Sequence, residues 1–352
     1  MAVYWTIAII TVLISLYPAK SSKQYSILLI VSLIPLFLYG ATRLNYGLDY
    51  NEYETYFNSV KLYGFQANER MEIGYFYLNK LLPNFRSLLI FQSILLCVSY
   101  YYLFKWYIPK QYAWLGFILL FLAGPLTVFF MLSGIRNGIA ICILILSSNY
   151  IQKRKILPFA IAVFIAYLFH NSIVLYAPIA YFVASGKPIT KRSITIWLLA
   201  SLIIVLTSST IILEFVDIII RMYFERYSTY VEFAKEQSSG AGLLVSLFSF
   251  VVISILLLLF KDKKLKVKEN MVVNLTLLFF LTNLLGPLNM RMSQYFVSFF
   301  IAGSIIVISR SKNKPFKLAY FVAIFAFLIY SLMLWFKNPY FSYDTYKSIL
   351  FN

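Results

Sequence analysis

Apolar segments long enough to cross a lipid bilayer recur along the whole chain, and this feature limits the possible folds more than any other. Hydrophobic residues make up 61% of the 352 positions and charged residues only 12%. Inside lipid hydrocarbon, backbone N–H and C=O groups must pair within the protein, so a spanning segment without strand alternation is a helix. The sequence therefore predicts an all-α, polytopic integral membrane protein.

Breaks in hydropathy predict about twelve transmembrane helices in a single domain that covers residues 1–352. The first stretch, MAVYWTIAII, has no basic region and no small-residue cleavage site, so we interpret it as a first span and not as a cleaved signal. An even number of spans puts both termini on one side. The expected spans are 2–17, 24–41, 86–104, 112–131, 135–151, 156–170, 171–185, 193–213, 243–260, 271–287, 292–309 and 316–336.

The connections between these spans separate by charge. One alternate set, counted with Lys317, holds 19 of the 31 basic residues but only two acidic ones, Asp262 and Glu269. The positive-inside rule makes this set cytoplasmic, so both termini are expected to face outward. The net charge of +18 is then an orientation signal, and no stretch resembles a nucleic-acid-binding surface. The set comprises 18–23, 105–111, 152–155, 186–192, 261–270 and 310–315.

The apolar segment 156–185 is read as two short spans and not as one long one. Its flanks, KRK at 153–155 and KPITKR at 187–192, are both strongly basic, so both are expected inside. The chain must then go out and return, bending at His170–Asn171. Each half is about fifteen residues, fewer than the roughly twenty that cross a bilayer, so the bend is expected in a protein-lined cavity.

Two outward loops are long, at 42–86 and 214–242, and both are expected to contain short helices at the membrane surface. In the first loop, Asp49 and Glu52 have the spacing of a helix N-cap and its capping-box partner. The second has an amphipathic spacing that is typical of an interfacial helix. Four residues of the first loop would share one helical face: Tyr50, Tyr53, Phe57 and Val60.

Four isolated polar residues stand at outer ends of the expected spans: Arg43, Arg136, His170 and Arg291. A charge at the edge of a span is costly and usually faces a polar cavity. A guanidinium stays charged when partly buried and matches phosphate oxygens with two parallel hydrogen bonds, so three arginines around one cavity suit a diphosphate. The ordinary alternatives are arginines that reach lipid headgroups, or that pair with Glu69, Glu72 or Asp344.

Arg136 lies in LSGIRNGIA, residues 132–140, which we expect to form the outer turn between the fourth and fifth spans. Ser133, Gly134 and Gly138 would allow close approach of the backbone. No acidic residue lies near Arg136 along the chain, so we expect its counterion to be the diphosphate of a bound ligand.

Candidates for acid–base chemistry are few. His170 is the only histidine, and its imidazole could accept a proton from a hydroxyl or hold a phosphate oxygen, although a lone histidine is often a packing residue. Asp49 and Glu72 are candidate general bases; the alternatives are a helix cap for Asp49 and a solvated or arginine-paired loop residue for Glu72. The two cysteines lie within spans and predict neither a disulfide framework nor a metal site.

Five short motifs, in this order and spacing, resemble the EpsG branch of the Wzy-type bacterial polysaccharide polymerases. The resemblance runs from about residue 40 to the end; at position 137, asparagine stands where that family often has glutamine. The motifs are Arg43 with GLDY at 47–50 and Tyr53, EIGY at 72–75, IRNGIA at 135–140, FHNS at 169–172 and RMSQYF at 291–296.

The resemblance implies a GT-C-like glycosyltransferase of the bacterial inner membrane that extends O-antigen, capsule or exopolysaccharide chains from undecaprenyl-diphosphate-linked repeat units. No metal or other cofactor is expected, and the implied partners are the lipid-linked glycans, membrane lipids and a chain-length regulator. In this hypothesis Arg136 and Arg291 hold the diphosphate and Arg43 supports it or binds an acidic sugar, while His170 acts with Asp49 or Glu72 on the acceptor. Four tyrosines could stack on sugars, although interfacial anchoring explains them equally well: Tyr50, Tyr53, Tyr75 and Tyr295.

Two other classes of protein remain open. A flippase for the same lipid-linked sugars would also need a cationic cavity, but the chain shows no internal repeat and its polar residues gather at one face. A membrane acyltransferase that modifies polysaccharide could use His170, but it would not explain three outward arginines.

Overall fold

The computed structural model describes residues 2–64, 71–184, 190, 195–197, 199, 203, 218, 265–283, 293–337 and 346–350. Apart from the few single residues in these ranges, the expected spans at 193–213 and 243–260 and the loop at 214–242 lie outside the described residues, as does Arg291. The elements are α1 (Ala2–Ser15), α2 (Ser22–Ala41), β1 (Arg43–Leu44), α3 (Tyr50–Tyr63), α4 (Ile73–Leu81), α5 (Phe85–Tyr107), η2 (Lys110–Tyr112), α6 (Ala113–Leu122), η3 (Gly124–Leu126), α7 (Val128–Ser133), α8 (Ile135–Gln152), α9 (Ile156–Tyr167), α10 (Ile173–Val183), α15 (Val267–Asn283), α17 (Val297–Arg310), α18 (Lys314–Lys337) and β2 (Lys347–Ser348).

Helices dominate the described chain, as the hydropathy pattern predicts. The expected spans at 2–17, 24–41, 86–104, 135–151 and 316–336 coincide with α1, α2, α5, α8 and α18 to within three residues at each end. Three described helices are long and apolar enough to cross a membrane, namely α2, α5 and residues 314–333 of α18. The number rises to four if the bent pair α6–α7 counts as one span. Several other apolar helices are shorter, so the count of twelve stays a prediction.

The expected span at 112–131 is interrupted, because the chain breaks between α6 and α7 with a bend of 74°, and the two helices are long and apolar enough only as a pair. Pro125 lies just after Gly124 in the short η3 turn, and a proline lacks the N–H that would continue the helix. The Thr127 hydroxyl donates across the break to the carbonyl oxygen of Leu120 over 3.0 Å, and it also lies 2.9 Å from the carbonyl oxygen of Ala123, which already accepts from backbone N–H groups. The Gly-Pro pair was a signal for this break.

The predicted bend at His170–Asn171 is confirmed. Helices α9 and α10 are joined by the turn at residues 168–172 and pack back on each other. At the far ends of the two helices, a guanidinium nitrogen of Arg154 donates to the carbonyl oxygen of Tyr181 over 2.8 Å, and the Phe159 and Tyr181 rings lie 5.1 Å apart. The two basic flanks therefore predicted the hairpin correctly.

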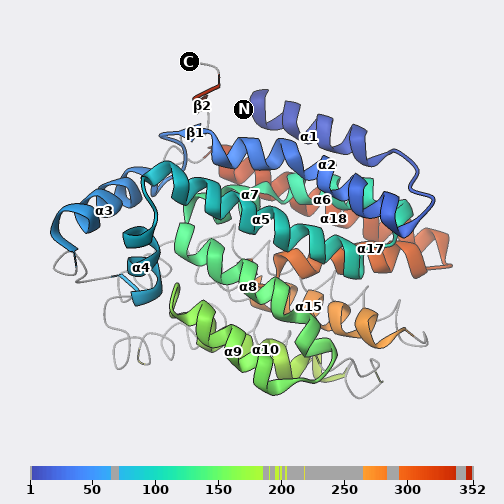
Figure 1. The fold of residues 1–352 in the computed structure, drawn as a ribbon. Helices are drawn as coiled ribbons and strands as arrows, with labels where there is room; N and C mark the ends of the chain where they lie inside the picture. The colour runs from blue at the N-terminus through green and yellow to red at the C-terminus, as the bar shows by residue number, and fades with distance from the viewer. Residues whose placement is uncertain are drawn as a thin grey trace. The chain divides into compact units, whose positions relative to one another are not determined.

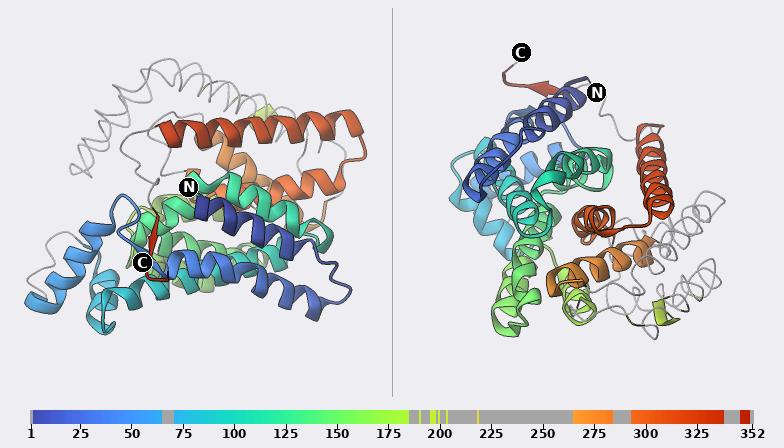
Figure 2. Two further views of the ribbon diagram at one scale, coloured as in Figure 1. Left: turned by 90° about the horizontal axis from the view of Figure 1, so that it is seen from above. Right: turned by 90° about the vertical axis from the view of Figure 1, so that its right-hand side faces the viewer.

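The described chain divides into two compact units, residues 1–182 with 328–352 and residues 183–327. In the first unit, α1, α2, α5, α8 and α9 follow one another side by side (Figure 1). Helix α3 extends beyond the ends of α1, α2 and α5 (Figure 2). The loop between α2 and α5 thus forms a separate helical projection at one end of this layer.

In the second unit, α15 packs tightly against α17. A Cβ added at Gly303 would lie 1.9 Å from the Thr276 hydroxyl oxygen, so α17 can approach α15 this closely only with glycine at that position. The Thr276 hydroxyl also donates to the carbonyl oxygen of Phe299 over 3.1 Å. Glu269, which we expected in a cytoplasmic loop, lies in the first turn of α15 and pairs with Arg310 at 2.7 Å. This end of the unit is fixed by a partly buried ion pair.

A short antiparallel pairing, β1 with β2, ties the C-terminal segment to the end of α2. Ser348 is the register partner of Arg43, and the Ser348 hydroxyl donates to the Thr42 hydroxyl over 2.8 Å. The Tyr346 ring stacks on Tyr39 with centroids 4.5 Å apart, and Tyr39 also contacts Tyr4 of α1. Both ends of the described chain therefore lie at the same end of the first unit; that this end faces outward stays a prediction.

Candidate active site

Helix α3 buries the face that its spacing predicts. Tyr50, Tyr53, Phe57 and Val60 are each at most 6% exposed and pack with residues of α4, α5 and α8. The predicted capping box is wrong: Asp49 occupies the N-cap position, but its side chain makes no capping hydrogen bond. Its φ of −99° and ψ of 11° differ from the extended backbone that directs a capping side chain toward the helix.

Helix α4 brings Glu72 to the turn between α9 and α10. Glu72 is the N-cap residue of α4, and the backbone N–H of Gly74 donates to the carbonyl oxygen of Leu168 over 2.8 Å. A Cβ added at Gly74 would lie 2.7 Å from that oxygen, so only glycine allows the two backbones to approach this closely. The start of α4 is therefore docked on the 168–172 turn.

This docking assembles Arg136, Glu72 and His170 from three separate segments. Arg136 Nη1 forms a short ion pair with Glu72 Oε2, and His170 Nδ1 lies 3.5 Å from the other oxygen, Oε1. The backbone N–H of Asn171 also donates to Oε1, over 3.4 Å. The side chains of Glu72 and His170 are 7% and 11% exposed, whereas that of Arg136 is 23% exposed. Arg136 is thus the most accessible member of the trio.

The expectation that Arg136 has no acidic partner is wrong, since Glu72 supplies one from 64 positions away in the sequence. Glu72 was among the alternatives, but only tertiary docking of α4 brings it within reach. The pairing uses Nη1, and Arg136 Nε is buried without a hydrogen-bond partner among the described residues. The guanidinium carbon also lies 6.0 Å from the centroid of the Tyr53 ring. Arg136 therefore keeps donor capacity beyond its carboxylate partner.

The surroundings of Glu72 keep its carboxylate ionised. Burial alone would raise the pKa of Glu72, but the nearby imidazole of His170 and the positive charge of Arg136 outweigh it and lower the pKa to about 2. A carboxylate with so low a pKa is a weak base at neutral pH. Its position between Arg136 and His170 instead suits it to hold both side chains in place.

Arg136 stands in the first turn of α8, where the helix favours negative charge. The N-cap residue is Gly134, which has no side chain to cap the first N–H groups, and those groups carry the positive end of the helix dipole. Asn137 is buried, and its side-chain oxygen Oδ1 finds no hydrogen-bond partner among the described residues. A helix N-terminus with an adjacent arginine can bind a phosphate group.

The predicted close approach around LSGIRNGIA is confirmed for Gly138, where an added Cβ would lie 2.3 Å from the carbonyl oxygen of Met131. Ser133 also packs closely, because a Cβ at Gly47 would lie 3.3 Å from its Cα. Gly134 makes no such contact. The Asp49 backbone N–H lies 3.4 Å from the Ser133 hydroxyl, so the start of α3 adjoins the α7–α8 junction.

Arg43 does not line an open cavity, contrary to the role we expected for it. It is 1% exposed, and its guanidinium donates to Gly40 O at 2.7 Å, Gln92 Oε1 at 2.8 Å and Leu132 O at 2.9 Å. Burial lowers the pKa of Arg43, but an arginine so placed stays charged at neutral pH. Its contacts are those of an interior cross-link.

The four tyrosines proposed for sugar stacking are packed inside the protein. Tyr75 is 0% exposed and stacks on Tyr56 at 5.7 Å, and Tyr50 packs its ring against Phe85 at 5.2 Å. Tyr295, which belongs to the second unit, is also 0% exposed. Stacking on a sugar needs an open ring face, so these three residues contribute to the core; Tyr53, beside Arg136, adjoins the trio.

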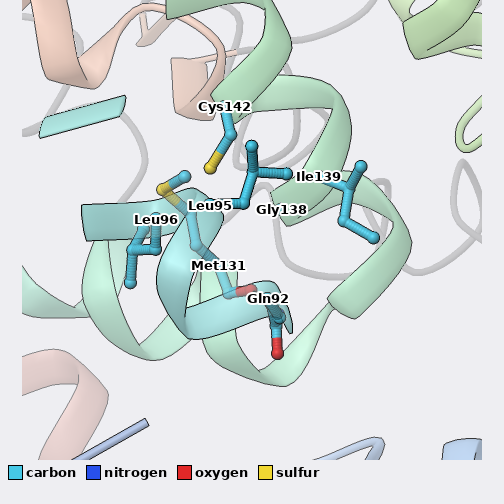
Figure 3. Close-up of a pocket in the computed structure, with 7 residues that line it drawn as sticks. All are labelled: Gln92, Leu95, Leu96, Met131, Gly138, Ile139 and Cys142. Atoms are coloured by element: carbon cyan, nitrogen blue, oxygen red, sulfur yellow. Dashed lines mark hydrogen bonds between the residues drawn. The ribbon is translucent and has the colours of Figure 1, made fainter. Parts of the chain in front are cut away.

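Gln92 was missed by the sequence analysis, although a glutamine within an apolar span was a signal for an interior polar contact. It lines a narrow crevice where α5, α7 and α8 meet, together with Leu95, Leu96, Met131, Gly138, Ile139 and Cys142 (Figure 3). The crevice has no room for a water molecule. It is a packing gap and not a ligand pocket. Among the described residues, no three His, Cys, Asp or Glu side chains could hold a metal ion.

A family model of the EpsG family matches residues 3–347, nearly the whole chain. The chain belongs to the EpsG family. Neither a curated protein nor a solved structure matches it. Membership indicates a membrane protein of polysaccharide biosynthesis, which agrees with the long apolar helices. The segments at 72–75, 135–140 and 169–172, on which the resemblance was based, meet in the trio.

Proposed function

We propose that this EpsG-family protein is a polysaccharide polymerase. It would join undecaprenyl-diphosphate-linked oligosaccharide repeat units on the outer face of the bacterial cytoplasmic membrane, for O-antigen, capsule or exopolysaccharide synthesis. The observation that carries the proposal is the trio itself: an accessible arginine at a helix N-terminus, joined through one carboxylate to the only histidine of the chain. Family membership supports polysaccharide biosynthesis as the setting.

In the proposed reaction, a hydroxyl oxygen of one lipid-linked glycan attacks the anomeric carbon of another. The bond from that carbon to the phosphate oxygen breaks, and its electron pair leaves with undecaprenyl diphosphate. Negative charge grows on the departing diphosphate, so a cation placed there lowers the barrier. Arg136 supplies that cation through the guanidinium N–H groups that Glu72 does not use, and the first turn of α8 adds its dipole.

The proton of the attacking hydroxyl is assigned to His170. Its Nδ1 faces the Glu72 carboxylate at 3.5 Å, and its Nε2 is assigned as the atom that accepts the proton. Glu72 then stabilises the imidazolium that forms and keeps the ring in position, as a carboxylate does beside a catalytic histidine. This assignment follows from the low pKa of Glu72, which makes it the weaker base.

Glu72 and the diphosphate compete for one guanidinium in this scheme. Without substrate, the carboxylate neutralises Arg136; when the diphosphate binds, Arg136 turns part of its hydrogen bonding to the phosphate oxygens. Arg291 is proposed as the second cation at the diphosphate. Asp49, whose backbone adjoins Ser133, is kept as the alternative base. A chain-length regulator is proposed as a protein partner.

The test is to incubate purified protein in detergent with a synthetic undecaprenyl-diphosphate repeat unit and to separate the glycans by length. A ladder of lengths is expected. If verified repeat unit yields no ladder, while liposomes that contain the protein move the same lipid across the bilayer, the polymerase proposal is wrong and a flippase is favoured.

A further inference from the structure

The last turn of α7 is held by side chains from other helices. Helix α7 has only six residues, and the final carbonyl groups of a helix have no partner within it. Here Leu132 O accepts a hydrogen bond from Arg43 and Met131 O accepts one from the amide of Gln92. Two side chains thus satisfy consecutive carbonyl groups at the end of α7, and one of them brings a positive charge, which a helix C-terminus favours.

Arg43 and Gln92 also hold each other. Arg43 Nη2 donates to Gln92 Oε1, while Nη1 donates to Gly40 O at the end of α2. The backbone of Arg43 is fixed as well, since its carbonyl oxygen accepts from Arg86 over 2.7 Å and Ser348 pairs with it in the β1–β2 ladder. Arg43 Nε finds no partner among the described residues, but Nη1 and Nη2 make three hydrogen bonds that the buried guanidinium would lose if it moved, so this geometry resists displacement.

The end of α7 determines where α8 begins. A Cβ added at Gly138 would lie 2.3 Å from the carbonyl oxygen of Met131, so the first turn of α8 rests directly on the last turn of α7. That oxygen is the one to which Gln92 donates. Arg136 projects from the same turn of α8 as Gly138, four residues after Leu132.

We propose that Arg43 and Gln92 are positioning residues for Arg136. They touch neither the substrate nor the reacting atoms. Instead they hold the Met131 and Leu132 carbonyl groups and thereby fix the first turn of α8. Arg136 reaches the diphosphate from this turn. This inference rests on the proposed polymerase function. It also gives Arg43 a definite part in the reaction that differs from the phosphate contact its sequence position suggested.

A double-mutant cycle tests the inference. Arg43→Lys keeps the charge but loses the planar fork that reaches Gly40, Gln92 and Leu132 together. In otherwise unchanged protein, this substitution should slow ladder formation about 30-fold, because small misplacements of a charged group at a reacting centre are costly. In the Arg136→Ala background, measured with radiolabelled repeat unit, the same substitution should slow the residual reaction less than about twofold.

Arg310→Lys is the matched control, because Arg310 also makes two hydrogen bonds to a partly buried partner, Glu269 Oε1, but stands in α17 of the second unit and is not part of the Arg43–Gln92 contact. It should lower thermal stability in detergent while leaving ladder formation within about twofold of wild type. An equal loss of rate in Arg310→Lys, or an equal loss from Arg43→Lys in both backgrounds, would show general loosening and overturn the positioning role.

If Arg43→Lys does not fold, Gln92→Glu tests the same claim, because it keeps an acceptor for Arg43 but removes the donor to Met131. It should show the same dependence on Arg136; equal losses with and without Arg136 would again count against the inference. Absence of a ladder from wild-type protein would instead contradict the polymerase function. A normal wild-type ladder with no effect of Arg43→Lys would contradict the positioning role alone.

Discussion

Arg43 and Arg136 occupy equivalent places in the sequence, at ends of apolar segments, but their surroundings in the structure differ. Arg43 is 1% exposed and donates to two backbone carbonyl groups and an amide oxygen, which are neutral acceptors that it holds permanently. The Arg136 side chain is 23% exposed and pairs with a carboxylate, a charged partner that another anion can replace. The kind of partner, more than the charge of the arginine, therefore separates a structural from a functional role.

The largest expected effect is that of removing Arg136. Arg136→Ala should slow ladder formation about 1,000-fold, because a cation at the leaving group contributes as much as an oxyanion-hole donor. Arg136→Lys should retain an intermediate rate, since lysine keeps the charge but loses the two-pronged hydrogen bonding. The measurement is the rate of ladder formation per milligram of folded protein. Full activity in both variants would remove Arg136 from the mechanism.

Replacing Arg43 by methionine should act first on stability. The substitution leaves Gln92 Oε1 and the carbonyl groups of Gly40 and Leu132 without their donor, at a cost of about 3 kcal/mol in the free energy of unfolding. Thermal unfolding in detergent, compared with Arg136→Met, measures the difference between the two arginines. Equal losses of stability in both variants would remove the distinction drawn between them.

His170→Gln should slow ladder formation about 100-fold, in the range that a general base contributes. Glutamine keeps a hydrogen-bonding side chain beside Glu72, but its amide does not accept a proton near neutral pH. The binding of undecaprenyl diphosphate to the variant should change less than about threefold, because His170 acts on the acceptor side. A variant that loses lipid binding while its rate at saturation is unchanged would assign His170 to the phosphate instead.

The smallest expected effect is the pH dependence of the Glu72 contribution to stability. The folded-state pKa of about 2 lies below the usual value of 4.5, so the contribution is complete above pH 4.5 and is lost as the pH falls toward 2. The unfolding temperature of wild type should therefore exceed that of Glu72→Gln by a clear margin at pH 5 and by a smaller margin at pH 3. A margin that stays constant down to pH 3 would contradict the ion pair with Arg136.

Much of the fold follows from the sequence. The length of an apolar segment and the charge of its flanks indicate which segments lie in the membrane and which lie in water. They located α2, α5, α8 and α18 and the bend at His170–Asn171. The pairing of Arg136 with Glu72 depends instead on the Gly74 backbone docking at Leu168, a tertiary contact that no local pattern displays. The burial of Arg43 was equally hidden, because its acceptors are mostly backbone oxygens, which every residue has.

The most direct test of the central claim is the affinity of purified protein for undecaprenyl diphosphate, measured for wild type and Arg136→Ala in the same detergent. If Arg136 exchanges Glu72 for the diphosphate, the alanine variant should bind at least about 100-fold more weakly, as expected for loss of a charge-assisted, two-pronged contact. Equal affinities would show that the Arg136–Glu72 pair is purely structural and would contradict the account.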